Sequence, residues 1–239
     1  MNVLAIDTSN QAMTVAVINE QKLLGQLQTT VNKNHSQTLM PAIQTLMSDL
    51  VMQPKALNRI VVAQGPGSYT GLRIGVTTAK TLADTLNIEL VGVSSLKVLA
   101  ANCVNQAGWI VPIFDARRKN VYAGAYEWQA GQLVNVLSDQ HIALPDLLKK
   151  LQGKPVYFVG EDVHKFVADI HEVLPEAQIN PVLNWDYPNG ATLAVLGLAE
   201  TPVDIHGFLP EYLKRVEAEE KWLETQGHVV KEESYVEKI

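Results

Sequence analysis

The sequence has 239 residues, of which 47% are hydrophobic and 18% charged, and its formal net charge is −6. A chain of this size can bury one or two hydrophobic cores. Its acidic balance argues against unaided nucleic-acid binding, because neutralising phosphates requires a basic surface. Cys103 is the only cysteine, which excludes an internal disulfide and fits a reducing compartment. The chain opens without a signal-peptide pattern and has no apolar run of membrane-spanning length, so we expect a cytoplasmic protein without membrane contact.

The first half of the chain predicts three strands in succession, followed by alternating helices and strands. The expected strands lie at 2–6, 13–18, 23–31, 59–63 and 90–93, and the expected helices lie at 35–51, 69–86 and 95–104. The second half restarts this order near Trp109. Its expected strands lie at 110–114, 121–126, 133–137, 156–159 and 179–183, and its expected helices lie at 144–151, 163–174 and 191–200.

One pattern is therefore used twice, and both first strands are followed by an aspartate, Asp7 and Asp115. A repeat of this size predicts two similar α/β lobes, each a mixed sheet flanked by helices, packed across a cleft. We expect an N-terminal lobe at 1–106 and a reduced C-terminal lobe at 107–206. The segment 207–239 is expected to pack back on the first lobe, with a charged helix around Glu217–Glu224.

The stretch from Gly65 to Gly75, GPGSYTGLRIG, joins an apolar strand to a long helix, with Ser68 placed to cap that helix. Such a junction can bind phosphate, because exposed amides and the helix dipole converge there. The spacing does not match a P-loop, which needs Lys-Ser or Lys-Thr after its last glycine. It does not match a dinucleotide fingerprint either, because Thr70 stands where glycine or alanine is needed.

Two rows run along the helix at 69–86. One is an apolar stripe that includes Leu72, and beside it Gly71, Gly75 and Thr78 form a row of small residues. A glycine inside a helix costs about 1 kcal/mol relative to alanine, so the row predicts close approach of a neighbour. That neighbour is either part of the same chain or a partner protein. If it is a partner, Gly75→Arg should abolish pairing and leave the circular dichroism intact.

The helix at 35–51 carries an apolar arc that is broader than packing on one sheet requires. Leu39, Ile43, Leu46 and Leu50 form its central stripe, and Met40, Met47 and Val51 widen it. Methionine adapts its shape to different surfaces, so the flank that carries Met40 and Met47 is the expected partner face.

Four motifs carry a resemblance to a known family: AIDTS at Ala5–Ser9, NHSQTLMPAI at Asn34–Ile43, GPGSYTGLRIG, and PEYLKRVEAE at Pro210–Glu219. Together they resemble the TsaB family, also called YeaZ, strongly in the first lobe and more loosely in the second. The resemblance implies a duplicated ribonuclease-H-like fold, the ASKHA fold of actin, Hsp70 and hexokinase.

Membership would imply a non-catalytic subunit of the bacterial complex that makes threonylcarbamoyladenosine in tRNA. In that family TsaB pairs with the ligase subunit TsaD, and the ATPase TsaE completes the assembly. ATP and metal are used by these partners, and tRNA is met only through the complex. TsaB also forms a homodimer through the surface offered to TsaD, built from its first two helices. The implied partner-binding residues are Met40, Ile43, Met47, Gly71, Leu72, Gly75 and Thr78.

Asp7, Thr8 and Ser9 occupy the position of the first phosphate loop of the fold. A kinase would use such an aspartate to orient a metal-bound water, whereas a non-catalytic chain would use it to cap a turn. The second half of a nucleotide site is missing, because the loop at 115–118 has no glycine and Gly160 is followed by Glu161 and Asp162. We therefore expect no cofactor of its own. A small-molecule kinase with Asp7 as base is the alternative function.

No catalytic residues and no metal ligands are predicted elsewhere. The sequence lacks the GxSxG and HExxH patterns of hydrolases and proteases, and it has no HxxxH pair. His164 and His171 lie two helical turns apart, as surface histidines of a helix do. Arg117, Arg118 and Lys119 form the one tight basic cluster, for which a solvated turn is the default interpretation; contact with tRNA inside a complex is left open.

Overall fold

A computed structural model describes residues 1–31 and 34–214 of the chain. It contains two five-stranded sheets. The first has the order β3-β2-β1-β4-β5. Its strands are β1 (Asn2–Asp7), β2 (Met13–Asn19), β3 (Leu23–Thr29), β4 (Arg59–Gly65) and β5 (Glu89–Ser94). β1 pairs antiparallel with β2 and parallel with β4, so the sheet is mixed.

The second sheet has the order β10-β9-β6-β7-β8, which repeats the first when read from its other end. Its strands are β6 (Trp109–Asp115), β7 (Asn120–Gln129), β8 (Gln132–Ala143), β9 (Val156–Val159) and β10 (Gln178–Ile179). The same neighbours pair in the same sense, antiparallel for β6 and β7 and parallel for β6 and β9. The predicted duplicated ribonuclease-H-like fold is therefore confirmed.

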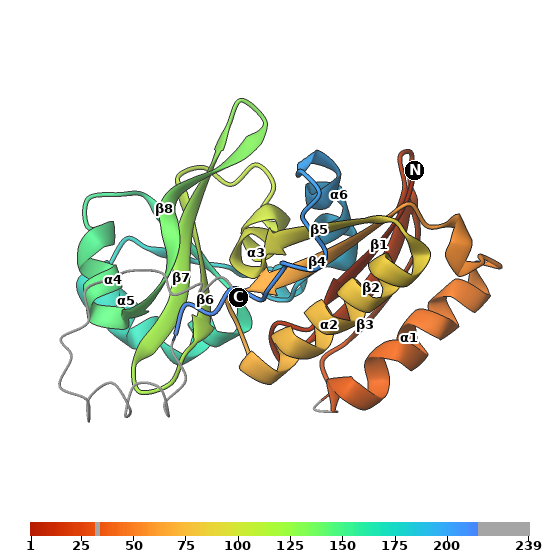
Figure 1. Ribbon diagram of the computed structural model, residues 1–239. Coiled ribbons are helices and arrows are strands. Elements are labelled where there is room, and N and C mark those ends of the chain that lie inside the picture. Colours follow the sequence, from red (N-terminus) through yellow and green to blue (C-terminus); the bar gives the residue numbers. More distant parts are fainter. Residues whose placement is uncertain (32–33, 215–239) are drawn as a thin grey trace, which may run out of the picture.

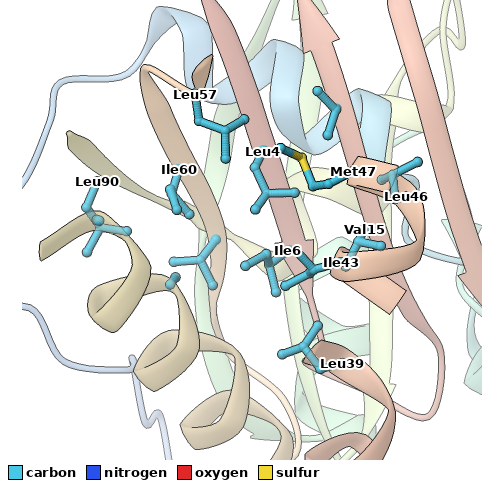
Figure 2. Packing of buried hydrophobic residues seen from close by; sticks show 14 of the residues in the cluster. Leu4, Ile6, Val15, Leu39, Ile43, Leu46, Met47, Leu57, Ile60 and Leu90 are labelled. Atoms are coloured by element: carbon cyan, nitrogen blue, oxygen red, sulfur yellow. The ribbon is translucent and has the colours of Figure 1, made fainter. Parts of the chain in front are cut away.

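Helices cover both faces of the first sheet, because β1 and β4 are apolar on both sides. α1 (His35–Asp49) and α2 (Tyr69–Leu86) lie on one face, as Figure 1 shows, and α6 (Gly190–Ala199) lies on the other. In Figure 2 the α1 side chains Leu39, Ile43, Leu46 and Met47 point onto strand residues that include Leu4 and Ile6.

α3 (Ser95–Asn102) lies between the two lobes. Its Val98 belongs to the core that α6 shares with the first sheet, whereas Leu96 and Leu99 pack against the second sheet. The other face of the second sheet is covered by α4 (Leu144–Leu151) and α5 (Val167–Val173). One helix therefore contributes to the cores of both lobes, and the lobes share packed apolar surface.

The helix starts follow the sequence signals. The Asn34 side chain caps α1 by accepting from the backbone N–H of Ser36, and the Ser68 side chain caps α2 by accepting from Gly71 N–H. α2 ends at Asn87, whose left-handed backbone (φ 52°) is the usual way to stop a helix. The bounds of α2, α4 and β9 are the predicted ones.

Three predictions on the second half need correction. The expected helix at 163–174 is divided by Phe166 into a 3₁₀ turn (Glu161–Lys165) and α5. The expected strand at 179–183 is reduced to β10. Asn180 N–H makes a last bond to Phe158 O of β9, the Asn180 side chain bonds Asp186, and a 3₁₀ turn (Leu183–Asp186) follows. The predicted boundary at 206 is displaced, because α6 packs on β1 and β2 of the first lobe.

The chain after α6 stays on the first lobe. Val203 N–H donates to the carbonyl oxygen of Leu90, and Glu211 N–H donates to that of Gln64. The expected return of 207–239 thus holds for 207–214. The expected charged helix around Glu217–Glu224 lies outside the described residues. Within those residues, no helix combines the length and the apolar character needed to cross a bilayer.

Candidate partner-binding face

A groove separates α1 from α2 on the outer side of the first lobe. It has a volume of about 560 Å³, and none of its lining residues is charged. The lining comes from β1, α1, α2 and the segment between α1 and β4: Leu4, Met40, Ile43, Gln44, Met47, Ser48, Val51, Met52, Gln53, Pro54, Leu57, Leu82 and Leu86. An uncharged groove flanked by two helices suits the apolar side chains of a partner.

Three of the predicted partner residues belong to this groove. Met40 is 47% exposed, so it can contact a partner directly. Ile43 and Met47 are almost fully buried and pack on the strands below. They form the base of the groove, and Met40 stands at its rim. The sequence singled out the side of α1 that lines the groove but could not separate rim from base.

Val51 is a further groove residue with unusual properties. It is 92% exposed, and its backbone is left-handed, with φ 50°. It follows the C-cap of α1, where its N–H donates to Ser48 O and Met52 N–H donates to Met47 O. Glycine is the usual residue at such a position, and a β-branched side chain there is strained. A strained, exposed valine lowers the stability of the isolated chain, which points to a role at the surface.

The small-residue row on α2 has an explanation inside the chain. A Cβ on Gly71 would overlap the carbonyl oxygen of Thr8, and one on Gly75 would overlap the Thr8 hydroxyl. That hydroxyl donates to Gly71 O at 2.7 Å. Gly71, Gly75 and Leu72 are buried, so the close neighbour that the row predicts is part of the same chain. Thr78 is half-buried and stands outside the groove lining.

The loop after β1 is closed against α2. Asp7, Thr8 and Ser9 are all at most 2% exposed. Asp7 Oδ1 accepts from the backbone N–H of Ser9 (2.8 Å), and Ser9 O accepts from Ser68 N–H (2.6 Å). Burial raises the pKa of Asp7, and its Oδ2 has no hydrogen-bond partner in the described part of the chain. The turn-capping role considered from the sequence is present, and a substrate could not reach this carboxyl without rearrangement.

The corresponding loop after β6 is built differently. Arg117, Arg118 and Lys119 all have left-handed backbones, with φ between 53° and 67°. Asp115 Oδ1 accepts from Arg117 N–H, and Lys165 forms ion pairs with Asp115 (3.1 Å) and with Asp162 (2.7 Å). Part of the negative charge predicted to repel a nucleotide is thus neutralised by Lys165.

Two buried polar networks escaped the sequence analysis. Asp186 in the second lobe accepts from Gly160 N–H, from Asn180 Nδ2 and from His164 Nε2, at 2.8–3.0 Å. His164 is therefore a half-exposed partner of a buried carboxylate, more than a plain surface histidine. Gly160, His164 and Asn180 lie 26, 22 and 6 positions from Asp186, so no local pattern could reveal the network.

The second network joins the lobes. Asp139 on β8 accepts from Tyr126 Oη at 2.6 Å and from Ser94 Oγ, at the end of β5. Burial raises the pKa of Asp139. As for metals, residues 1–31 and 34–214 hold no group of three or more His, Cys, Asp or Glu side chains placed to bind one ion.

Comparison with known proteins gives one consistent result. A family model described as "TsaD: tRNA N6-adenosine threonylcarbamoyltransferase" matches residues 15–222. The "tRNA threonylcarbamoyladenosine biosynthesis protein TsaB" of Bacillus subtilis is 45% identical over 228 residues, 95% of this chain and all of that protein. The chain belongs to the TsaB family.

More distant relatives of the TsaB family agree. The Escherichia coli protein of the same name is 26% identical and covers 82% of this chain, with 91% of its own length matched. The solved structure "YeaZ from Pseudomonas aeruginosa" superposes with a TM-score of 0.73 at 26% identity, over 89% of this chain and 99% of that one. The TsaB match therefore spans both lobes, including α1 and α2.

Proposed function

We propose that this chain is the non-catalytic partner subunit of the tRNA threonylcarbamoyladenosine complex, which binds and activates the ligase TsaD together with the ATPase TsaE. The Bacillus subtilis relative is named for that biosynthesis and matches over its full length, which supports the same pathway here. On this proposal, ATP and metal serve the partner subunits, and tRNA is met only inside the complex.

The observation that carries the partner role is the α1–α2 groove. Its lining is uncharged, and Met40 and Val51 expose apolar surface at its rim. A few apolar anchors in such a site can supply most of a binding free energy, at roughly 2 kcal/mol or more each. The same surface would serve the homodimer when the ligase subunit is missing, because a methionine-bearing face adapts to either occupant.

The closed loop after β1 supports a non-catalytic role. A kinase of this fold would need Asp7 beside a metal-bound water, yet Asp7 is fully buried and its Oδ1 is held by the Ser9 N–H of its own loop. Opening that loop would break the Thr8–Gly71 and Ser68–Ser9 hydrogen bonds. The kinase alternative therefore lacks a supporting observation.

The test is a binding experiment between the purified chain and the TsaD subunit of the same organism. The Met40→Glu variant places a charge at the groove rim, and we expect it to weaken the complex at least tenfold by isothermal titration calorimetry. Val134→Glu on β8 of the second lobe is the matched control, since Val134 is similarly exposed, and it should bind as the unchanged chain does. Equal binding by both variants would exclude the groove as the partner site.

A further inference from the structure

The described chain ends beside the helices that form the groove. Lys80 on α2 donates to the carbonyl oxygens of His206 and Phe208, and the Tyr212 ring lies 4.8 Å from that of Tyr69. The segment 206–212 thus runs along α2 from its middle to its first residue. Residues 215–239 leave from that end of the helix.

The same end is where both helices begin. Ser68 N–H, at the start of α2, donates to Ser9 O, and His35 Nε2, at the start of α1, donates to Asn10 O. Both starts are therefore attached to the loop after β1. Met40, on the second turn of α1, is the exposed groove residue nearest this end. Leu82 and Leu86 in the last two turns of α2 line the far end of the groove, so the chain leaving Lys214 must cross the start of α2 and then follow the helices to enter the groove at Met40.

The length of chain beyond Lys214 is sufficient. Leu223 lies nine positions after Lys214, which is a reach of about 30 Å when extended. The 18 residues of α2 span about 27 Å. The apolar pair Trp222–Leu223 can therefore reach Met40, at the near end of the groove, and Val229 and Val230 follow six positions after Leu223.

Charge does not oppose this placement. Residues 215–239 carry seven glutamates and four basic residues, so they would be repelled by an acidic surface. The groove lining has no charged residue and offers mainly methionine, leucine and valine side chains. A tethered segment also acts at an effective concentration of order millimolar, so even a weak contact would be populated.

We propose that residues 215–239 bind in the α1–α2 groove of their own chain, with Trp222 and Leu223 as the apolar anchors, and compete there with the partner subunit. The proposal rests on the partner role of the groove. On this proposal the terminal segment and the partner subunit compete for the same groove. The chain then stays unpaired until a partner that binds the groove more tightly displaces the segment.

Disulfide trapping in the full chain tests the placement. Met40→Cys and Leu223→Cys are combined, and Val195→Cys with Leu223→Cys is the control, because Val195 is exposed on the opposite face of the first sheet. Cys103 is buried, and burial raises its pKa to about 12, so it does not react. We expect the 40–223 pair to close within one chain at least tenfold faster than the 195–223 pair, at a rate independent of protein concentration.

Two results would overturn the proposal. Equal rates for the two pairs would mean that the segment has no preference for the groove. A 40–223 disulfide that joins two chains, at a rate rising with concentration, would assign the groove to a second copy. Adding the TsaD subunit should slow closure at least threefold. If the pair closes quickly and TsaD has no effect, the placement stands and the proposed partner function fails.

Discussion

The two lobes share one strand order and differ in how the loop after their first strand is held. In the first lobe, Asp7–Ser9 are buried, and Thr8 packs directly on α2, where glycines at 71 and 75 permit the contact. In the second, the loop at 115–119 lies at the surface and is held by Asp115 and Lys165. The comparison shows that a phosphate-loop position can become a packing element in one lobe and a charged turn in the other. In the first lobe, the surface that remains open to a partner is the groove between α1 and α2.

The largest effect should follow from filling the contact between α2 and the first loop. Gly71→Ala places a methyl group against the backbone of Thr8, and we expect a loss of about 3 kcal/mol in unfolding free energy, despite alanine's better helix propensity. Urea denaturation measures it, with Thr77→Ala, exposed on the same helix, as the control. An unchanged midpoint would show that the loop moves freely. For the same reason Gly75→Arg should unfold the chain, whereas the sequence alone predicted a loss of pairing only.

The second lobe should be weakened by removing its central acceptor. Asp186→Ala leaves the Gly160 N–H and the Asn180 amide buried without this partner, at a cost of about 2 kcal/mol. Asp186→Asn, which keeps one acceptor oxygen, should recover part of that loss. Asp169→Ala removes only an exposed ion pair with Lys119 and should have almost no effect. Thermal melts that rank these three variants differently would contradict the account of this network.

A smaller change at the groove rim should separate stability from pairing. Val51→Gly relieves a left-handed valine, so we expect the free energy of unfolding to rise by roughly 0.5–1 kcal/mol. The same change removes 92%-exposed apolar surface, and binding to the TsaD subunit should weaken several-fold. Asn87→Gly, at the left-handed cap of α2, is the control. It also replaces a left-handed residue by glycine, but it removes no apolar surface from the groove rim. If Val51→Gly raised stability without weakening binding, the rim would have no part in pairing.

The smallest effect concerns pH. Burial raises the pKa of Asp7 in the folded chain above its value in the unfolded chain, so the folded state binds the extra proton as pH falls. The destabilisation by Asp7 is therefore absent below the unfolded pKa of about 4 and develops as pH rises through the folded value. Asp7→Asn should stabilise the chain at pH 7 and have no effect near pH 4. If Asp7→Asn raised the stability equally at both pH values, the raised pKa of the buried Asp7 would be contradicted.

Much of the fold could be predicted because local signals agreed with tertiary contacts. The caps at Asn34 and Ser68 and the apolar strands at 59–65 and 109–115 each specify their element locally. The side of α1 that lines the groove could also be predicted locally, because Met40 and Met47 mark it in the sequence. The neighbour of the α2 glycines could not be predicted, because a small-residue row does not say which element approaches it. α6 was placed in the wrong lobe because it is apolar on every side, which predicts burial without naming the sheet that buries it.

The Asp186 and Asp139 networks were missed because their members come from separate elements. No periodicity links Ser94, Tyr126 and Asp139. Tyr126 and Asp139 meet because β7 pairs with β8, and the packing of the two lobes against α3 brings Ser94 beside them. Such contacts join residues that are far apart in the sequence. They exist only once both sheets have formed and packed together, so local sequence patterns do not predict them.

The most direct test of the central claim is tRNA threonylcarbamoylation reconstituted from TsaD, TsaE, threonylcarbamoyl-adenylate and tRNA, with this chain either present, omitted or replaced by Met40→Glu. The account predicts full modification with the unchanged chain, little without it, and little with Met40→Glu, while Val134→Glu supports the full rate. Modification at an undiminished rate when the chain is left out would contradict it.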